Sequence, residues 1–264
     1  LRTPLNGILG YTQLLRRDPS LTADQHQAIE VMHQSGEHLL LLINDILDLA
    51  KIEAGKLELT LAPFNLSDAL RNLIEITRLR AQQQGVTFLY EEDAVLPREV
   101  YGDEKRLRQI ILNLLGNAVK CTPHGAIVLR ALPSGADRIA IEVQDTGIGI
   151  TPEEIGRLFR PFERTRSGEQ VAGGTGLGLV ISREYAHLMR GEISVESRPD
   201  TGSCFRFEFH APPTVVAPIS SQPSRRVIGL GPGQGEIRIL VVDDQSSNRL
   251  LLREMLAPLG FVVD

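Results

Sequence analysis

The sequence predicts an α+β protein, in which a helical hairpin precedes an α/β-sandwich domain and the incomplete start of a doubly wound α/β domain. Three observations lead to this fold class. Apolar residues recur at helical spacing through residues 1–54,. Short strands and amphipathic helices then alternate up to residue 210,. A segment rich in proline and glycine follows, and a fully apolar strand begins a new pattern after it,.

The first element expected is a helix over residues 1–17, and a longer helix follows from about residue 23 to residue 54. "RDPSLTADQ" separates them and offers Ser20 and Thr22 as N-caps,. Two helices with so short a connection form an antiparallel hairpin. The apolar stripe of the second helix is too wide for one hairpin to cover, which favours a four-helix bundle made by a homodimer. The alternative is that the stripe packs on the rest of the same chain.

The α/β domain is expected over residues 56–211. Its strands are "KLELTLAPFNL", "VTFLYEED", "AIVLRAL", "DRIAIEVQD", "EISVES" and "SCFRFEFH", and its helices are residues 67–84, "YGDEKRLRQIILNLLGNAVKCT", "PEEIGRLF" and "GLGLVISREYAHLMRG". Asp103 is the expected N-cap of the second of these helices, and Pro152 occupies the first turn of the third,. Residues 212–236 form a linker, and "IRILVVDD" opens a β-α-β unit over residues 237–264,.

Composition excludes several classes of protein. The formal net charge of -5 argues against a general nucleic-acid binder,. The two cysteines lack metal-site spacing and indicate a reducing compartment,. No apolar run reaches the roughly 20 residues of a membrane helix, and no signal peptide is visible, so a cytoplasmic location is expected,. The chain opens on Leu1 and stops within a pattern, which suggests a piece of a longer protein, and any membrane contact would come from segments upstream.

Three motifs carry candidate chemistry. Asn113 and Asn117 lie one turn apart on a helix face, with Lys120 a turn further on, and amide oxygens with a lysine suit a metal-bound phosphate,. The alternative is a solvated polar face. "DTGIGI" delivers Asp145 at a strand end, where a carboxylate accepts from the amino group of a base, or it is an ordinary turn. "GGTGLGL" opens a helix, and its glycines let backbone N–H groups approach a polyphosphate,.

The order of these motifs resembles the catalytic ATP-binding domain of sensor histidine kinases, in the ATPase class shared with gyrase and a heat-shock chaperone. The family's N box is similar to "RLRQIILNLLGNAVKCT", its glycine boxes to "DTGIGI" and "GGTGLGLVIS", and its F box to "LFRPFER". The end of its H box is similar to "LRTPLNGILGY", and the second hairpin helix to "LINDILDLAKIEAGKLEL". The segment "ILVVDDQSSNRLLL" resembles the first strand and helix of a receiver domain. The resemblance therefore implies a hybrid histidine kinase.

The resemblance implies ATP and Mg²⁺ as cofactors and assigns site residues. Asn117 would hold Mg²⁺, Asn113 would assist, Lys120 would contact phosphate and Asp145 would bind the adenine amino group, with Gly147 and Gly149 beneath the base. Phe159 and Phe162 would anchor a lid that carries Arg164 and Arg166, and the triphosphate would be wrapped by Gly174, Thr175, Gly176, Leu177 and Gly178. Thr3 would be the family's phosphatase-linked residue, and Asp243 and Asp244 the Mg²⁺-binding acids of the receiver.

The chain departs from the family pattern at its ends. The family's phosphoacceptor His and the following Glu would stand two positions and one position before Leu1, so the phosphoryl group would pass to that upstream histidine and then to an aspartate of a receiver, in cis or in a separate response regulator. The receiver's phosphate-accepting aspartate would lie beyond Asp264. Two other functions stay open: an ATPase that acts by conformational change without a phosphohistidine, and a non-enzymatic dimerisation scaffold. Because Asn113 replaces the glutamate base of the gyrase-like relatives, it weighs against the first.

Overall fold

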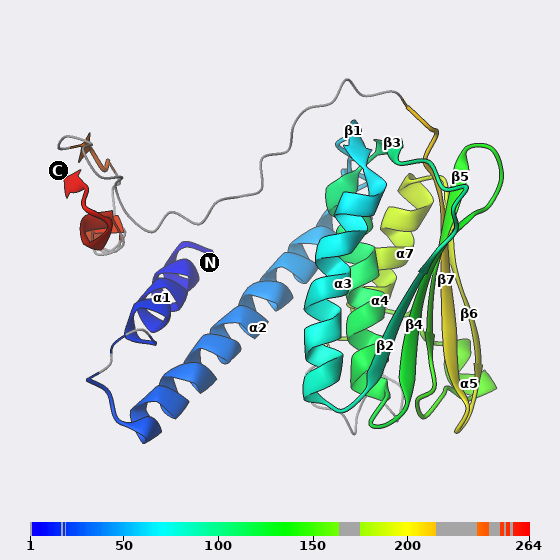
Figure 1. Cartoon of the computed structure of the whole chain (residues 1–264), viewed down its shortest axis with the longest axis horizontal. Helices are drawn as coiled ribbons and strands as arrows, with labels where there is room; N and C mark the ends of the chain where they lie inside the picture. Colours follow the sequence, from blue (N-terminus) through cyan, green and yellow to red (C-terminus); the bar gives the residue numbers. More distant parts are fainter. Residues whose placement is uncertain are drawn as a thin grey trace. The chain divides into compact units, whose positions relative to one another are not determined.

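The computed structural model describes residues 2–16, 18, 20–163, 175–214, 237–242, 249–250, 252–253 and 256–264, without the side chains of residues 2 and 3. The chain divides into two compact units (Figure 1). One contains residues 1–44 and 220–264, and the other contains residues 45–219. No helix among the described residues is long and apolar enough to cross a membrane.

The N-terminal helices are α1 (Arg2–Leu15) and α2 (Ala23–Glu53). The N-cap prediction for α2 is confirmed at Thr22, whose hydroxyl accepts a hydrogen bond from the Gln25 backbone N–H at 3.3 Å. The Gln25 side chain accepts in return from the Thr22 backbone N–H at 2.8 Å. Two otherwise unpaired donors of the first turn are thereby satisfied.

The two helices form the predicted antiparallel hairpin. The Arg16 guanidinium lies 2.8 Å from the Glu30 carboxylate near the connection. Further along, Thr12 Oγ1 lies 2.8 Å from His33 Nδ1. Gly36 packs still further along against the side chain of Leu9, so closely that an added Cβ would lie 2.8 Å from its Cδ2 atom. Earlier residues of α1 thus meet later residues of α2, as antiparallel packing requires.

The larger unit is built on a five-stranded sheet with the order β2-β4-β5-β7-β6. Its strands are β2 (Thr87–Glu92), β4 (Ala126–Pro133), β5 (Arg138–Asp145), β6 (Glu192–Arg198) and β7 (Gly202–His210). The β2–β4 pair is parallel and the other pairs are antiparallel. The turn "RPDTG" joins β6 to β7 as a hairpin. The strand register pairs Asp145, at the end of β5, with Ser203 of β7.

Three helices cover one face of this sheet (Figure 1): α3 (Leu66–Gln83), α4 (Glu104–Cys121) and α7 (Gly178–Leu188). The short helix α5 (Pro152–Ile155) begins at Thr151 with a capping box. The core between helices and sheet includes the fully buried side chains of Leu70, Leu73, Leu107, Ile110, Ile111, Leu114, Leu115, Ile127 and Phe207. The predicted α/β sandwich therefore exists because α4 is apolar toward the sheet and polar away from it.

One strand prediction was only partly right. Of "KLELTLAPFNL", only β1 (Ala62–Asn65) is a strand, and it pairs with the unpredicted strand β3 (Glu99–Gly102). Leu57 and Leu59 pack against the hydrophobic core instead. Alternating polarity marks an extended segment with one apolar side, but only a neighbouring strand with free backbone groups makes it part of a sheet.

At the C-terminal end, β8 (Arg238–Ile239) and β9 (Val262–Val263) pair in parallel. The 3-10 turn η1 (Ala257–Leu259) precedes β9 and ends at Gly260, whose φ is 94°. Parallel pairing of consecutive strands agrees with the β-α-β pattern expected from the sequence. The acids Asp243 and Asp244 lie outside the described residues.

Candidate nucleotide-binding site

The amide-bearing face belongs to α4. Asp103 caps this helix by accepting from the Arg106 backbone N–H at 3.0 Å, as predicted. Asn113 and Asn117 are half-buried, whereas Lys120 is exposed. Because the neighbouring apolar residues of α4 are held in the core, the two amides and the lysine are confined to the opposite, polar side of the helix.

Asn113 is fixed by helix α7. Its Nδ2 atom donates to the hydroxyl of Ser182 at 2.9 Å. Ser182 is only 3% exposed. An added Cβ at Gly178 would lie 2.5 Å from Asn113 Oδ1, so the helix start and the amide approach each other as closely as a glycine allows,. Asn113 and the glycine-rich start of α7 therefore belong to one site.

Asp145 lies at the opposite end of this polar face. It is 5% exposed, and its Oδ1 atom accepts from the Gly147 backbone N–H at 2.8 Å. Burial raises the pKa of the Asp145 carboxyl above its usual value, although backbone hydrogen bonds from Gly147 and Ser203 act in the opposite direction. A buried carboxylate with unused acceptor capacity suits a ligand that donates a hydrogen bond.

The turn after Asp145 is held by two glycines that pack closely against the backbone of other segments. An added Cβ on Gly147 would overlap the backbone oxygen of Cys121, the last residue of α4. Gly149 has a φ of 68° and packs against the backbone of Arg198 in the same manner. Both glycines are therefore required by the protein's own packing, whether or not a base lies beside them.

The glycine-rich turn before α7 is organised by Thr175. Its hydroxyl accepts from the Leu177 backbone N–H at 3.1 Å. Gly176 has a φ of 71°, and its carbonyl oxygen accepts from the Phe162 backbone N–H at 3.2 Å. Leu177 is fully buried, which anchors the turn in the core.

The two predicted lid anchors behave differently. Phe159 is partly buried against the core, and the Arg183 guanidinium lies 4.8 Å from its ring centroid. Arg183 Nη2 also donates to the Phe159 carbonyl oxygen at 3.3 Å. Phe162 is 64% exposed and has a φ of 64°, so it contributes a backbone hydrogen bond rather than a buried ring.

These contacts bring most of the predicted residues together along α4. Gly178 contacts Asn113, and Gly147 contacts Cys121, so Asn117 and Lys120 lie on the helix between the two contact points. Gly174 and the lid arginines Arg164 and Arg166 lie outside the described residues. The side chain of Thr3 is outside them too, and only its place in α1 is described.

Sequence reasoning missed two residues that shape this site. Ser182 and Arg183 stand on the first turns of α7 and contact Asn113 and Phe159, respectively. Helical spacing could have identified Ser182, because it follows Gly178 by four residues and therefore lies on the same face of the helix,.

Two family descriptions match the chain. Residues 1–55 match the His Kinase A (phospho-acceptor) domain, and residues 102–213 match the Histidine kinase-, DNA gyrase B-, and HSP90-like ATPase family. The chain belongs to the sensor histidine kinase family. The match of residues 102–213 includes α4, the Asp145 turn and α7, so the polar face of α4 lies within the ATPase domain of this kinase.

The chain is also similar to named sensor proteins. The kinase is 36% identical over 266 residues to the aerobic respiration control sensor protein ArcB of Escherichia coli, covering all of this chain and 33% of that protein. It is 43% identical over 220 residues to the sensor protein GacS of Pseudomonas syringae, covering 80% of this chain and 24% of that protein. The chain thus spans between a quarter and a third of these relatives. The crystal structure of full-length ShkA in complex with AMPPNP matches with a TM-score of 0.68 and 32% identity, over 99% of this chain and 52% of that one.

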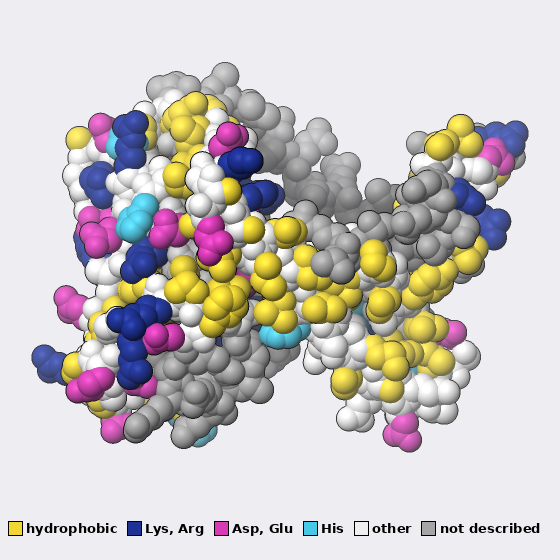
Figure 2. Space-filling view, turned by 180° about the vertical axis from the view of Figure 1, so that it is seen from behind, with side chains coloured by type: hydrophobic (Ala, Val, Ile, Leu, Met, Phe, Trp, Pro, Cys, Tyr) yellow, Lys and Arg dark blue, Asp and Glu magenta, His cyan; other side chains and the backbone are white. Residues whose placement is uncertain are grey.

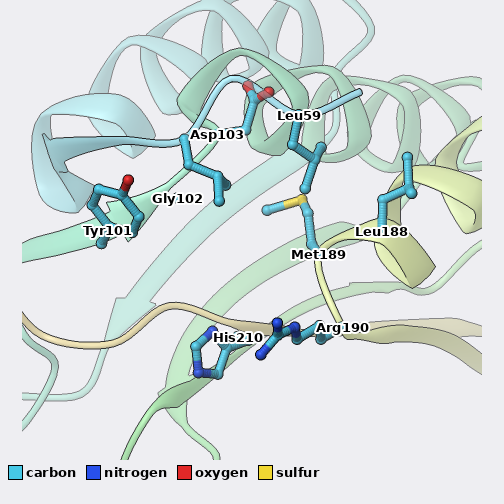
Figure 3. Close-up of a pocket in the computed structure, with 9 residues that line it drawn as sticks. Leu59, Tyr101, Gly102, Asp103, Leu188, Met189, Arg190 and His210 are labelled. Atoms are coloured by element: carbon cyan, nitrogen blue, oxygen red, sulfur yellow. The ribbon is translucent and has the colours of Figure 1, made fainter. Parts of the chain in front are cut away.

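A separate cavity of about 250 Å³ opens elsewhere in the kinase (Figure 3). It is lined by Leu59, Leu61, Tyr101, Gly102, Asp103, Leu188, Met189, Arg190 and His210. The cavity lies beside the N-terminal end of α4, next to Asp103, and the C-terminal end of α7, next to Leu188. The predicted nucleotide site lies toward the opposite end of each helix. Asp103 is already engaged there by the backbone N–H groups of Thr60 and Arg106.

Proposed function

We propose that this chain is the catalytic core of a hybrid histidine kinase that binds Mg-ATP along the polar face of α4. The boundaries proposed are residues 1–55 for the dimerisation hairpin, 56–211 for the ATP-binding domain, 212–236 for the linker and 237–264 for the start of a receiver. The observation that carries the proposal is the position of Asn113, Asn117 and Lys120 between the Asp145 turn and the start of α7.

The base would bind at the Asp145 end. An ionised Asp145 carboxylate accepts a hydrogen bond from the adenine amino group, and its second oxygen is not used by Gly147,. Gly147 and Gly149 would lie beneath the base, in a turn whose glycines pack directly on the backbone of Cys121 and Arg198,. This end of the site would supply specificity for adenine, because a base without the amino group leaves one acceptor position of the buried carboxylate without a partner.

The phosphates would bind at the α7 end. Gly174, Thr175, Gly176, Leu177 and Gly178 precede or begin this helix, whose N-terminus favours negative charge,. Mg²⁺ suits the amide oxygen of Asn117, with Asn113 beside it and Lys120 facing the phosphate charge, and when bound it would neutralise part of that charge. Phe159 and Phe162 would fix the start of the segment that covers the nucleotide.

The reaction would move the γ-phosphoryl group of ATP to a histidine two positions before Leu1, leaving ADP and a phosphohistidine. A receiver aspartate, in cis or in a separate response regulator, would then accept the phosphoryl group. Thr3 would take part in the phosphatase reaction, in which water hydrolyses this aspartyl phosphate and releases inorganic phosphate. Asp243 and Asp244 would hold the Mg²⁺ of the receiver in cis. Positioning and charge neutralisation supply most of the rate in such phosphoryl transfers.

A homodimer is the proposed assembly. The exposed large hydrophobic side chains described on the hairpin helices are Ile8, Tyr11, Leu15, Val31, Met32, Leu39, Leu41, Ile46 and Leu47. Figure 2 shows a band of hydrophobic side chains, coloured yellow, along these helices. Leu49 and Ile52 pack instead on the core of the same chain, so only the end of the stripe follows the alternative arrangement. A second hairpin would cover the remainder and complete a four-helix bundle. We expect the kinase core to lie in the cytoplasm, with any membrane anchor upstream.

A labelling experiment tests the proposal. The chain extended by His-Glu before Leu1 should incorporate label from γ-labelled Mg-ATP into an acid-labile, base-stable bond. The matched control carries Gln in place of the added His and should bind ATP without labelling. Steady ATP turnover without phosphoenzyme would instead favour the conformational ATPase, and an absence of nucleotide binding would favour the scaffold.

A further inference from the structure

The C-terminal part of α2 contacts the nucleotide-binding domain through two carboxylates. Thr175 Oγ1 donates a hydrogen bond to Asp45 Oδ2 at 3.1 Å. One turn further along, Asp48 Oδ2 accepts from the Tyr185 hydroxyl at 2.9 Å. Both partners, Thr175 and Tyr185, belong to α7 or to the turn that begins it. Neither carboxylate is part of the polar face of α4.

The Asp48 contact is a structural anchor. The Arg106 guanidinium lies 3.5 Å from Asp48 Oδ2 and stacks 4.2 Å from the Tyr185 ring centroid. The side chains of Arg106 and Asp48 are only 17% and 13% exposed. This cluster, together with the packing of Leu49 and Ile52 on the core, would hold the end of α2 in place without Asp45.

The Asp45 contact reaches the phosphate end of the proposed nucleotide site. Thr175 donates to Asp45 while accepting from the Leu177 backbone N–H at 3.1 Å. Burial raises the pKa of Asp45, and the charge of Asp48 adds to this, although the hydrogen bond from Thr175 acts in the opposite direction. On balance the surroundings of Asp45 disfavour negative charge. A polyphosphate at the start of α7 would bring further negative charge to the residue that Asp45 contacts. Like charges in a partly desolvated site repel one another strongly.

We infer that the Asp45–Thr175 contact is an inhibitory latch, in which this end of α2 and Mg-ATP compete for the start of α7. The inference rests on the proposed nucleotide site. Nucleotide binding then weakens the contact, and any change that draws Asp45 away from Thr175 strengthens nucleotide binding by the same factor, because coupling between two sites is reciprocal. Loss of the Asp45–Thr175 contact, with the Asp48 anchor kept, is thereby coupled to affinity at the phosphate site.

Asp45→Asn tests the latch in the full chain. The amide oxygen still accepts from Thr175, whereas the charge is lost. The dissociation constant of a fluorescent ATP analogue with Mg²⁺ should fall about fivefold or more, the lower range of typical allosteric coupling. Glu53→Gln is the matched control, because it removes one negative charge from an exposed position of the same helix and should leave the constant unchanged. Adenosine, which lacks phosphates, should bind equally to all three proteins.

A second measurement follows α2 directly. Amide hydrogen exchange in residues 45–47 of the unsubstituted protein should accelerate when Mg²⁺ and a non-hydrolysable ATP analogue are added, whereas residues 48–53 should stay protected because the Asp48 cluster holds them. Equal affinity of the Asp45→Asn variant and the parent, with tight binding by both, would overturn the latch and leave the proposed function standing. An equal gain in the Glu53→Gln variant would overturn it as well. Failure of every protein to bind the analogue would refute the proposed function itself, and the latch with it.

Discussion

The side chains of Asn113 and Ser182 are joined by a hydrogen bond of 2.9 Å between two helices, α4 and α7, although 69 residues separate them in the chain. The amide nitrogen is the donor, so the amide oxygen of Asn113 is directed away from the hydroxyl and toward the start of α7. An asparagine without this partner could present either its oxygen or its nitrogen to a ligand. Ser182 therefore fixes the orientation of the Asn113 amide, with its oxygen free to face the proposed Mg²⁺.

Replacement of this serine tests that role. Ser182→Ala removes about 1 kcal/mol of net hydrogen bonding, and Mg-ATP affinity should fall about fivefold. Affinity for adenosine should change little, because the Asp145 turn contacts the other end of α4. Ser194→Ala, at an exposed position of β6, is the matched control. Calorimetric titration of both variants gives the comparison, and equal losses for ATP and adenosine would argue for general damage to the fold.

Asp145→Asn should weaken ATP and adenosine binding alike, by about tenfold or more, because a hydrogen bond to a charged acceptor is lost. The amide oxygen of the variant can still accept from Gly147, so the turn should survive. Calorimetry with the two ligands measures the effect. Unchanged ATP affinity would contradict the role of Asp145 in adenine recognition.

The Asp145 carboxyl should also make the free energy of unfolding depend on pH. Its pKa is raised on folding, so the stabilisation that it contributes is complete below the unfolded value of 3.8 and is lost as pH rises through the folded value,. At neutral pH and without nucleotide, the Asp145→Asn variant should therefore be more stable than the parent, and the two should converge under acid conditions. Denaturant unfolding at a series of pH values measures this, and nucleotide affinity of the parent should fall as the carboxyl is protonated.

Asn117→Asp should alter the metal requirement. An added carboxylate near the phosphates attracts a cation more strongly but repels the nucleotide, so the Mg²⁺ concentration for half-maximal ATP binding should change. Adenosine binding should be unaffected because no metal is required. Titration of Mg²⁺ and Mn²⁺ at fixed nucleotide separates the two effects, and an unchanged metal dependence would remove Asn117 from the proposed metal ligands.

Asp103→Ala should lower the free energy of unfolding by about 1–2 kcal/mol, since the side chain caps α4. It accepts from the backbone N–H groups of Arg106 and Thr60 at 3.0 Å and 2.8 Å. Asp103→Asn keeps one acceptor oxygen and should lose less. Denaturant titration followed by circular dichroism provides the measurement, and a greater loss in the Asp103→Asn variant would contradict the capping role.

Local features of the chain were readable from the sequence. The cap at Asp103, the short helix that begins at Pro152 and the amide spacing of α4 all depend on residues within one or two turns of each other. Such features follow from backbone geometry and side-chain reach, which neighbouring residues determine. The strand prediction for residues 56–66 failed before Ala62 because pairing depends on where another strand lies, and β3 had no alternation to reveal it.

By itself, then, the sequence determined the helices, most strands of the sheet and the residue types of the proposed nucleotide site. Only the tertiary structure decided that Ser182 orients Asn113 and that Asp45 reaches Thr175, 130 residues further along the chain. The physical reason is that both bonds require helices distant in sequence to pack with a particular rotation. Hydrophobic periodicity states which face of a helix is buried, but not which polar atoms meet at the edge of that face.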